Sequence, residues 1–209
     1  MNNYLKEFGN IFVKLYNGNI ADCKSDIIVN AANSGLWMGG GVAGAIRSKG
    51  GIEIQQEALK YRPAKIGDII ITGAGKLDAK YIFHAVVIDE LFRQGTNLET
   101  VELALENIIN KIQNMNQKGD EIKSIAIPFL GTGVGRLKLE DVAYQTLRVF
   151  EKESKKLDKR LYITLPILRD NEFTQVIEAF NSYEPIEEEN RKIDKIAKEY
   201  INYLGEGFC

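Results

Sequence analysis

The feature that most constrains the fold is an alternation of short apolar runs with segments of helical periodicity along most of the chain. The run Ile27-Ile28-Val29 is continuous rather than alternating, which is typical of a parallel strand covered on both faces. Strands are predicted at residues 11–16, 26–30, 68–72, 81–87, 124–128 and 161–165. Because helices separate them, we predict an α/β fold whose mostly parallel sheet has helices on both sides.

The helices are predicted from the spacing of apolar residues and from capping signals. The longest reaches Met115, with Thr96 as N-cap and Glu99 three residues later as the partner of a capping box. The other helices are predicted at residues 41–49, 52–59, 142–157 and 172–180.

Charge and composition narrow the functional classes. The 209 residues include 27 Lys and Arg and 29 Asp and Glu, a balance that argues against sequence-independent nucleic-acid binding. One His and two Cys cannot supply within one chain the usual four nitrogen or sulfur ligands of a structural zinc site, and we expect neither a metal nor a cofactor. His84, the only His, is expected to be a core residue rather than part of a catalytic triad.

Sequence features also bear on the cellular compartment. No stretch approaches 18 uninterrupted apolar residues, so no membrane span is expected, and the first residues do not resemble a signal peptide. Cys23 and Cys209 lie far apart in the sequence and do not indicate a disulfide framework. These features predict a cytoplasmic protein.

The C-terminal part of the chain differs from the rest. An acidic segment with Pro185 is followed by apolar residues at helical spacing from Ile193 to Leu204. We therefore predict one domain over residues 1–183, and an acidic linker with an amphipathic helix over residues 184–209. Two roles stay open for that helix, which are docking on the domain and binding of a second copy or partner.

Glycine concentrates in two segments that each link a predicted strand to a predicted helix. Ten of the 19 glycines lie within residues 35–51 and 131–135, where the backbone must turn tightly or allow a ligand to approach. Free N–H groups at a helix N-terminus, or in a glycine-rich nest, bind anions. Two such loops at one sheet edge would hold a diphosphate from both sides.

Two common phosphate-binding motifs do not explain the first segment. Gly39, Gly41 and Gly44 satisfy the spacing G-x-G-x-x-G, but eight residues separate Asn30 at the strand end from Gly39. A dinucleotide fingerprint should follow its strand at once, so this match is weak. No Lys-Ser or Lys-Thr pair follows the glycines, which excludes a P-loop.

Taken together and in order, these segments resemble the macro domain family. The resemblance rests on Gly18-Asn19-Ile20, on Asp26-Ile27-Ile28-Val29-Asn30-Ala31-Ala32-Asn33, on Gly39-Gly40-Gly41-Val42-Ala43-Gly44-Ala45-Ile46 and on Gly131-Thr132-Gly133-Val134-Gly135. It covers roughly residues 10–182. It implies a three-layer α/β/α fold with a mixed, mostly parallel central sheet that binds ADP-ribose across the strand ends.

The resemblance also implies roles for particular residues. Asn33 would bind the distal ribose, residues 39–43 the distal ribose and a phosphate, residues 131–135 the diphosphate, and the Ile20 N–H the adenine. The full ligand-binding set implied in this way is Asn19, Ile20, Asp22, Ala32, Asn33, Gly39, Gly40, Gly41, Val42, Ala43, Gly131, Thr132, Gly133, Val134, Gly135, Arg136 and Leu168.

The chain departs from the family pattern at four of these positions. Asn19 stands where many members have Asp, so adenine recognition should be weaker unless Asp22 substitutes. Gly135 and Leu168 stand where an aromatic residue is common, which removes two stacking surfaces. Ala43 replaces the Asp that some hydrolytic members place in the first glycine-rich segment to activate water.

Three functions remain open on the sequence alone. The leading hypothesis is hydrolysis of the 1″-ester link of proteins mono-ADP-ribosylated on Glu or Asp. The substrate's own phosphate would hold the water, and Asn33 and the Gly41 N–H are the catalytic candidates. One alternative is a non-catalytic reader of ADP-ribose or ADP-ribosylated protein. The other is an ADP-ribose 1″-phosphatase or O-acetyl-ADP-ribose deacetylase.

Overall fold

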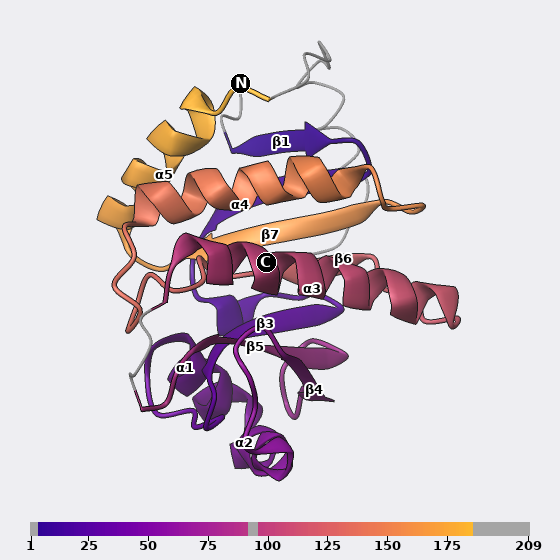
Figure 1. Cartoon of the computed structure of the whole chain (residues 1–209), viewed down its shortest axis with the longest axis vertical. Coiled ribbons are helices and arrows are strands. Elements are labelled where there is room, and N and C mark those ends of the chain that lie inside the picture. The colour runs from indigo at the N-terminus through magenta and orange to yellow at the C-terminus, as the bar shows by residue number, and fades with distance from the viewer. Residues whose placement is uncertain (1–3, 92–95, 186–209) are drawn as a thin grey trace.

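A seven-stranded mixed sheet forms the centre of the molecule, seen in a computed structural model that describes residues 4–91 and 96–185 (Figure 1). The strand order is β1-β2-β7-β6-β3-β5-β4. The inner strands pair in parallel, whereas the edge strands β1 and β4 pair antiparallel with β2 and β5. The strands are β1 Leu5–Phe8, β2 Ile11–Asn17, β3 Ile27–Asn33, β4 Ile69–Gly73, β5 Tyr81–Ile88, β6 Ser124–Ala126 and β7 Leu161–Ile167.

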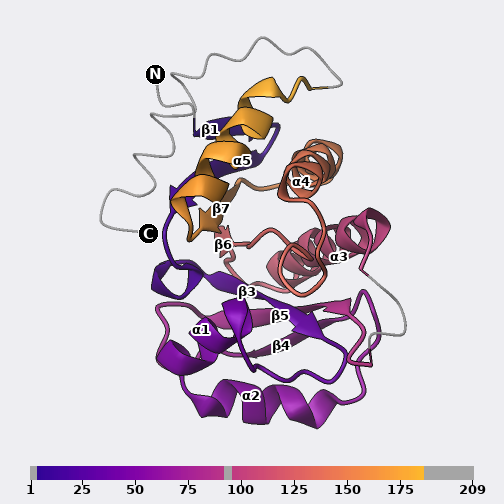
Figure 2. The same ribbon diagram turned by 90° about the vertical axis from the view of Figure 1, so that its left-hand side faces the viewer.

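Helices cover both faces of this sheet (Figures 1 and 2). Buried side chains of α3, α4 and α5 form one apolar core with one face, and those of α1 and α2 form a second core with the other. The helices are α1 Gly41–Gly50, α2 Ile52–Ala58, α3 Leu98–Gln117, α4 Leu139–Ser154 and α5 Asp170–Ser182, with short 3₁₀ turns η1 Ile20–Asp22 and η2 Leu59–Tyr61. The predicted three-layer α/β/α fold is confirmed.

The central strand β3 contains a continuous apolar run because helices cover both of its faces. Ile27 and Val29 belong to the core under α3 and α4, while Ile28 between them belongs to the core under α1 and α2. Successive side chains of a strand point to opposite faces, so consecutive apolar residues are needed where helices cover both faces of the strand. Beyond Ala31 the register shifts against β5 between Ala32 and Asn33, where the strand leaves the sheet.

Several predicted boundaries are wrong in detail. β1 was not predicted, β6 ends at Ala126 rather than at residue 128, and α4 covers Leu139–Ser154 rather than residues 142–157. The predicted N-cap Thr96 is wrong as well. Asn97 caps α3 by accepting a hydrogen bond from the Thr100 N–H at 2.8 Å, and the Thr96 hydroxyl donates to the Val87 carbonyl at 2.7 Å.

Three further predictions need comment. Cys23 is fully buried and disulfide-bonded, so the expectation of no disulfide is wrong. The predicted C-terminal helix lies outside the described residues, and the domain division at residues 183 and 184 stays a prediction. Within the part of the chain that the structure describes, no helix has the length and apolar character needed to cross a membrane.

Candidate ligand-binding site

The two glycine-rich loops leave the sheet at one edge. β3 and β6 are adjacent parallel strands, so their carboxyl ends lie on the same side, and each is followed by one of the loops (Figure 2). We call residues 34–40 after β3 the first loop and residues 127–138 after β6 the second loop. The ends of adjacent parallel strands are where open α/β sheets bind their ligands.

Side-chain hydrogen bonds fold the first loop onto the end of β3. The Asn33 amide donates to the Trp37 carbonyl at 2.9 Å and accepts from the Trp37 N–H at 3.3 Å. The Met38 N–H donates to the Gln55 side chain of α2 at 2.9 Å. Leu36 is buried with a φ of 57°, a conformation that non-glycine residues rarely adopt. The loop is therefore held in one defined shape.

The first loop leads into α1, a helix whose N-terminus has no side-chain cap. Gly40 is the N-cap of α1 and makes no side-chain cap, and Gly41 has a φ of 56° that favours glycine. A Cβ at Gly39, Gly40 or Gly41 would meet nothing within 4 Å, so space is open beside three consecutive residues. The N–H groups of a first helical turn lack acceptors within the helix. The arrangement suits an anion that approaches the backbone closely.

Ala43, which the resemblance places where some hydrolytic members have Asp, does not lie in that open space. Ala43 is 8% exposed and packs in the core beneath α1, next to Ile46. Val42, one residue earlier, is partly buried against the same core. The Ala43 side chain is therefore turned into the core, and this turn presents its backbone to the open space.

The second loop is a set of tight turns. The Arg136 N–H donates to the Gly133 carbonyl and the Leu137 N–H to the Gly131 carbonyl, both at 3.1 Å. The Thr132 hydroxyl donates to the Phe129 carbonyl at 2.9 Å. Arg136 has a φ of 56°, a second non-glycine residue in the left-handed region. Strained backbone of this kind clusters at functional sites, and each of the two loops contains one such residue.

Exposure of the second loop differs along its length. Val134 is 63% exposed, and a Cβ at Gly133 would meet nothing within 4 Å. In contrast, Gly131 has a φ of 82° and Gly135 lies against Thr96. The tip of the loop is therefore open, and its base is closely packed.

The predicted adenine-binding residues lie around the end of β7. Asn17 pairs with Ile167, and the Gly18 N–H donates to the Ile167 carbonyl at 2.9 Å. Leu168, 68% exposed, is therefore close to the start of η1. Asn19 caps η1 through a 3.0 Å hydrogen bond from the Ala21 N–H to its side-chain oxygen.

Asp22 and Ile20 complete that end of the site. Asp22 forms a 2.5 Å ion pair with Lys49 of α1, and both side chains are about half exposed. Ile20 is buried in the same core as Ile46. The structure therefore joins η1 to α1, and it places Leu168 near η1.

Two residues that sequence reasoning missed contact the first loop. Glu90 accepts a 2.9 Å hydrogen bond from the Trp37 indole, and Arg62 donates to both oxygens of Glu90 at 3.2 and 3.3 Å. The Arg62 guanidinium also lies 4.8 Å from the centre of the Trp37 ring. Nothing local in the sequence marks residues 62 and 90, since they reach Trp37 only through the topology of the sheet.

The only histidine is part of the core beside the first loop's strand. His84 is fully buried, with Nδ1 3.0 Å from the Asn30 amide nitrogen and Nε2 3.0 Å from the Thr72 hydroxyl. Because the Thr72 hydroxyl donates to the Gly73 carbonyl, His84 Nε2 carries the proton and Nδ1 accepts. Burial lowers the pKa of His84 to about 4. The prediction of a satisfied core histidine is confirmed.

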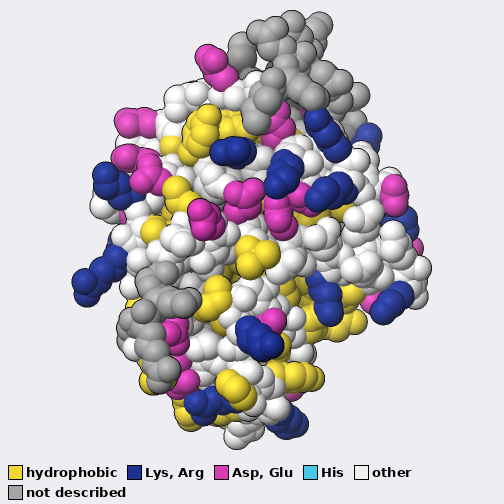
Figure 3. All heavy atoms as spheres, in the orientation of Figure 1, with side chains coloured by type: hydrophobic (Ala, Val, Ile, Leu, Met, Phe, Trp, Pro, Cys, Tyr) yellow, Lys and Arg dark blue, Asp and Glu magenta, His cyan; other side chains and the backbone are white. Residues whose placement is uncertain are grey.

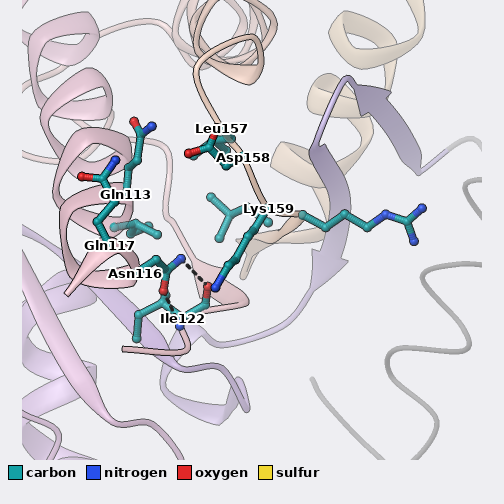
Figure 4. Close-up of a pocket in the computed structure, with 10 residues that line it drawn as sticks. Gln113, Asn116, Gln117, Ile122, Leu157, Asp158 and Lys159 are labelled. Atoms are coloured by element: carbon teal, nitrogen blue, oxygen red, sulfur yellow. Dashed lines mark hydrogen bonds between the residues drawn. The ribbon is translucent and has the colours of Figure 1, made fainter. Parts of the chain in front are cut away.

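A pocket and a surface of mixed charge lie away from the two loops. An apolar pocket of about 120 Å³ lies at the opposite edge, where β6 and β7 begin (Figure 4). There the Asn116 side chain both donates to and accepts from the Ile122 backbone. On the face shown in Figure 3, basic and acidic side chains are interspersed.

Comparisons with known proteins show the family to which the chain belongs. The macro domain family model matches residues 29–146. A protein of Pyrobaculum aerophilum is 33% identical over 85% of this chain and 95% of its own length. A macro domain-containing protein of Caldanaerobacter subterraneus is 40% identical over 66% of this chain and 76% of its own length. The chain therefore belongs to the macro domain family.

Solved structures show the same fold. A mutant macrodomain of Oceanobacillus iheyensis with ADPR has a TM-score of 0.73 at 22% identity, covering 84% of this chain and 95% of that one. The Trypanosoma brucei macrodomain in complex with ADP-ribose has a TM-score of 0.69 at 23% identity, covering 79% and 68%.

Proposed function

We propose that the chain binds ADP-ribose between its two glycine-rich loops. The observation that carries this proposal is the open space beside residues 39–41, at an uncapped helix start that adjoins the end of a central strand. Macrodomains of the same fold have been solved with ADPR and with ADP-ribose. The first helical turn of α1 binds one side of the diphosphate, and the exposed tip of the second loop, residues 132–134, binds the other.

The two ends of the ligand take different partners. Asn33 and the backbone of residues 39–43 contact the distal ribose, with Ala32 beneath them. The Ile20 N–H and the Asn19 oxygen contact adenine, with Leu168 as an apolar wall and Asp22 nearby. Three residues determine the shape of the second loop and make no side-chain contact with the ligand, because their φ values or contacts fix its turns. They are Gly131, Gly135 and Arg136.

We further propose that the site hydrolyses the 1″-ester link of ADP-ribose attached to Glu or Asp of a protein. Water held by a phosphate oxygen of the substrate attacks C1″, its proton passes to that oxygen, and the ester carboxylate leaves with the bonding electron pair. Asn33 orients the ribose and the Gly41 N–H holds the phosphate. The side chain of Ala43 is buried and carries no carboxylate, so the protein itself supplies no base in the first turn.

The proposal is tested with a protein that is mono-ADP-ribosylated on Glu or Asp and carries a labelled ADP-ribose. The wild-type chain should release the label as ADP-ribose, and Asn33→Ala should slow release by at least tenfold. Asn107→Ala is the matched control, because Asn107 also donates to a backbone carbonyl, that of Gly67 at 2.9 Å, but from α3. It should release the label at the wild-type rate.

Two other results would change the assignment. Retention of the label together with calorimetric ADP-ribose binding identifies a non-catalytic reader. If the wild-type chain does not bind ADP-ribose even at millimolar concentration, the proposed function is wrong.

A further inference from the structure

Three side chains from separate parts of the chain form one contact cluster beside the first loop. Trp37 comes from the first loop, Arg62 from the segment after η2, and Glu90 from the segment after β5. Glu90 accepts from both the indole N–H and the guanidinium, and the guanidinium stacks over the indole ring at 4.8 Å. We call these three residues the tryptophan clamp. Each member touches the other two, so the position of the Trp37 ring depends on both partners.

The backbone around the tryptophan clamp is tied to the sheet. The Ser34 N–H donates to the Ile88 carbonyl at 2.9 Å, and the Glu90 N–H donates to the Ser34 hydroxyl at 2.9 Å. The Ala64 N–H donates to the Ser34 carbonyl at 3.1 Å. These bonds do not involve the clamp side chains. Glu90 can therefore be substituted while its own backbone stays attached to the end of β3.

The clamp connects to the predicted ribose-binding residue through Trp37. The main chain of Trp37 makes both side-chain hydrogen bonds of Asn33. A side chain at Gly35 would overlap the Glu90 carboxylate, which therefore lies directly on the turn between Asn33 and Trp37. Moving the Trp37 ring would move the carbonyl and N–H that orient the Asn33 amide.

We propose that the tryptophan clamp orients Asn33 and so sets the affinity of the site for the distal ribose. The inference rests on the proposed binding of ADP-ribose. Arg62 and Glu90 act as positioning residues, because they act on the ligand through Trp37 and Asn33. The Arg62 and Glu90 side chains are each about one third exposed, so their ion pair is only partly screened by solvent.

The test compares two ligands that differ in the distal ribose. ADP-ribose carries it and ADP does not, so calorimetry of both on the full chain isolates that part of the site. For Glu90→Ala we expect ADP-ribose binding about tenfold weaker and ADP binding unchanged, the loss of about one oriented hydrogen bond. Glu90→Gln keeps an acceptor for the indole but loses the charge, and it should fall between wild type and Glu90→Ala.

A matched variant controls for loss of a surface charge. Glu121→Gln removes the partner of Lys123, an exposed ion pair at the opposite edge of the sheet. It should leave the affinities for both ligands unchanged. Trp37 is the only tryptophan of the chain, so its fluorescence reports the clamp directly. Its emission should shift in Glu90→Ala, and in the wild type it should respond more to ADP-ribose than to ADP.

The possible outcomes separate this inference from the proposed function. If Glu90→Ala weakens the binding of ADP-ribose and of ADP equally, or weakens the binding of neither, the clamp does not act through the distal ribose and the inference is wrong. If the wild-type chain binds ADP-ribose and ADP with the same affinity, Asn33 does not read the distal ribose and the inference again fails. If it binds neither ligand, the proposed function itself fails.

Discussion

The carbonyl oxygen of Gly131 lies so close to Gly135 that a Cβ on Gly135 would overlap it. The same Cβ would stand 3.0 Å from the Cβ of Thr96. A larger side chain, such as the aromatic residue that the resemblance predicts at this position, is therefore incompatible with this loop conformation. Glycine at this position is a structural requirement of the second loop, not only the loss of a stacking surface.

Substitution of Gly135 should therefore destabilise the protein. We expect Gly135→Ala to lower the free energy of unfolding by about 1–3 kcal/mol, because a tightly packed loop must move to admit one methyl group. Gly133→Ala is the matched control, because a Cβ there would meet nothing within 4 Å. It should leave the melting temperature unchanged and weaken ADP-ribose binding. Equal melting temperatures for the two variants would contradict this account.

Replacing Asn19 by Asp should strengthen adenine recognition without changing the fold. Asn and Asp are equivalent N-caps, so the hydrogen bond from the Ala21 N–H is retained. A charged acceptor is worth about 1–2 kcal/mol more than a neutral one, so calorimetry should show ADP-ribose binding about tenfold tighter. Unchanged affinity would mean that the Asn19 oxygen does not contact adenine.

Asp22 offers a separate test of where adenine is recognised. Its carboxylate pairs with Lys49 at 2.5 Å, at an exposed position where such pairs contribute little to stability. If Asp22 makes the adenine contact of the Asp that Asn19 replaces, Asp22→Asn should weaken ADP-ribose binding about tenfold. Calorimetry measures this change directly. If Asn19 is the acceptor, Asp22→Asn should have almost no effect.

The sequence predicted the layered fold because its signals are local. The apolar run of β3 and the spacing within α3 follow from burial of each element against its neighbours. The predicted boundaries of helices and strands are wrong where tertiary contacts compete with local sequence signals. Thr96 has the better capping-box pattern, but its hydroxyl bonds to Val87 of β5, so Asn97 caps the helix instead. β1 is four residues long and is defined by pairing with β2.

The candidate site was predictable only in part for a related reason. The glycines of both loops are visible in the sequence, and the structure places both loops at one edge of the sheet. The left-handed backbone of Leu36 and Arg136 has no sequence signal, because neither residue favours that conformation. Arg62 and Glu90 meet Trp37 only after β3 and β5 pair, so no local pattern could have identified them.

Substitutions at the start of α1 can separate the effect of backbone strain on stability from the effect of ligand contact on binding. Gly41→Ala should lower the free energy of unfolding by about 1–2 kcal/mol, because its φ of 56° is costly for alanine. Gly40→Ala should be nearly neutral, because its φ of −164° is extended backbone. Both methyl groups would enter the open space, so both variants should weaken ADP-ribose binding. Thermal unfolding and calorimetry measure the two effects, and normal binding by Gly40→Ala would contradict the proposed site.

The stability of the protein should depend on His84 in weakly acidic solution. In the unfolded chain the imidazole binds a proton below its ordinary pKa of 6.5, whereas burial holds the pKa of the folded protein at about 4. The unfolded state therefore binds more protons between these values, so the free energy of unfolding falls as the pH is lowered from about 6.5 to about 4.

The size of this effect and its origin can both be measured. The displacement of the His84 pKa from 6.5 to about 4 corresponds to about 3 kcal/mol of stability lost across that interval. Urea unfolding at a series of pH values should show the loss, and His84→Gln should remove most of the pH dependence even if its stability at pH 7 is lower. A wild-type stability that stays level from pH 7 to pH 4.5 would show that the folded protein accepts the proton on His84. The hydrogen-bond chain from Asn30 through His84 to Thr72 would then have to rearrange, because a doubly protonated imidazole cannot accept from the Asn30 amide.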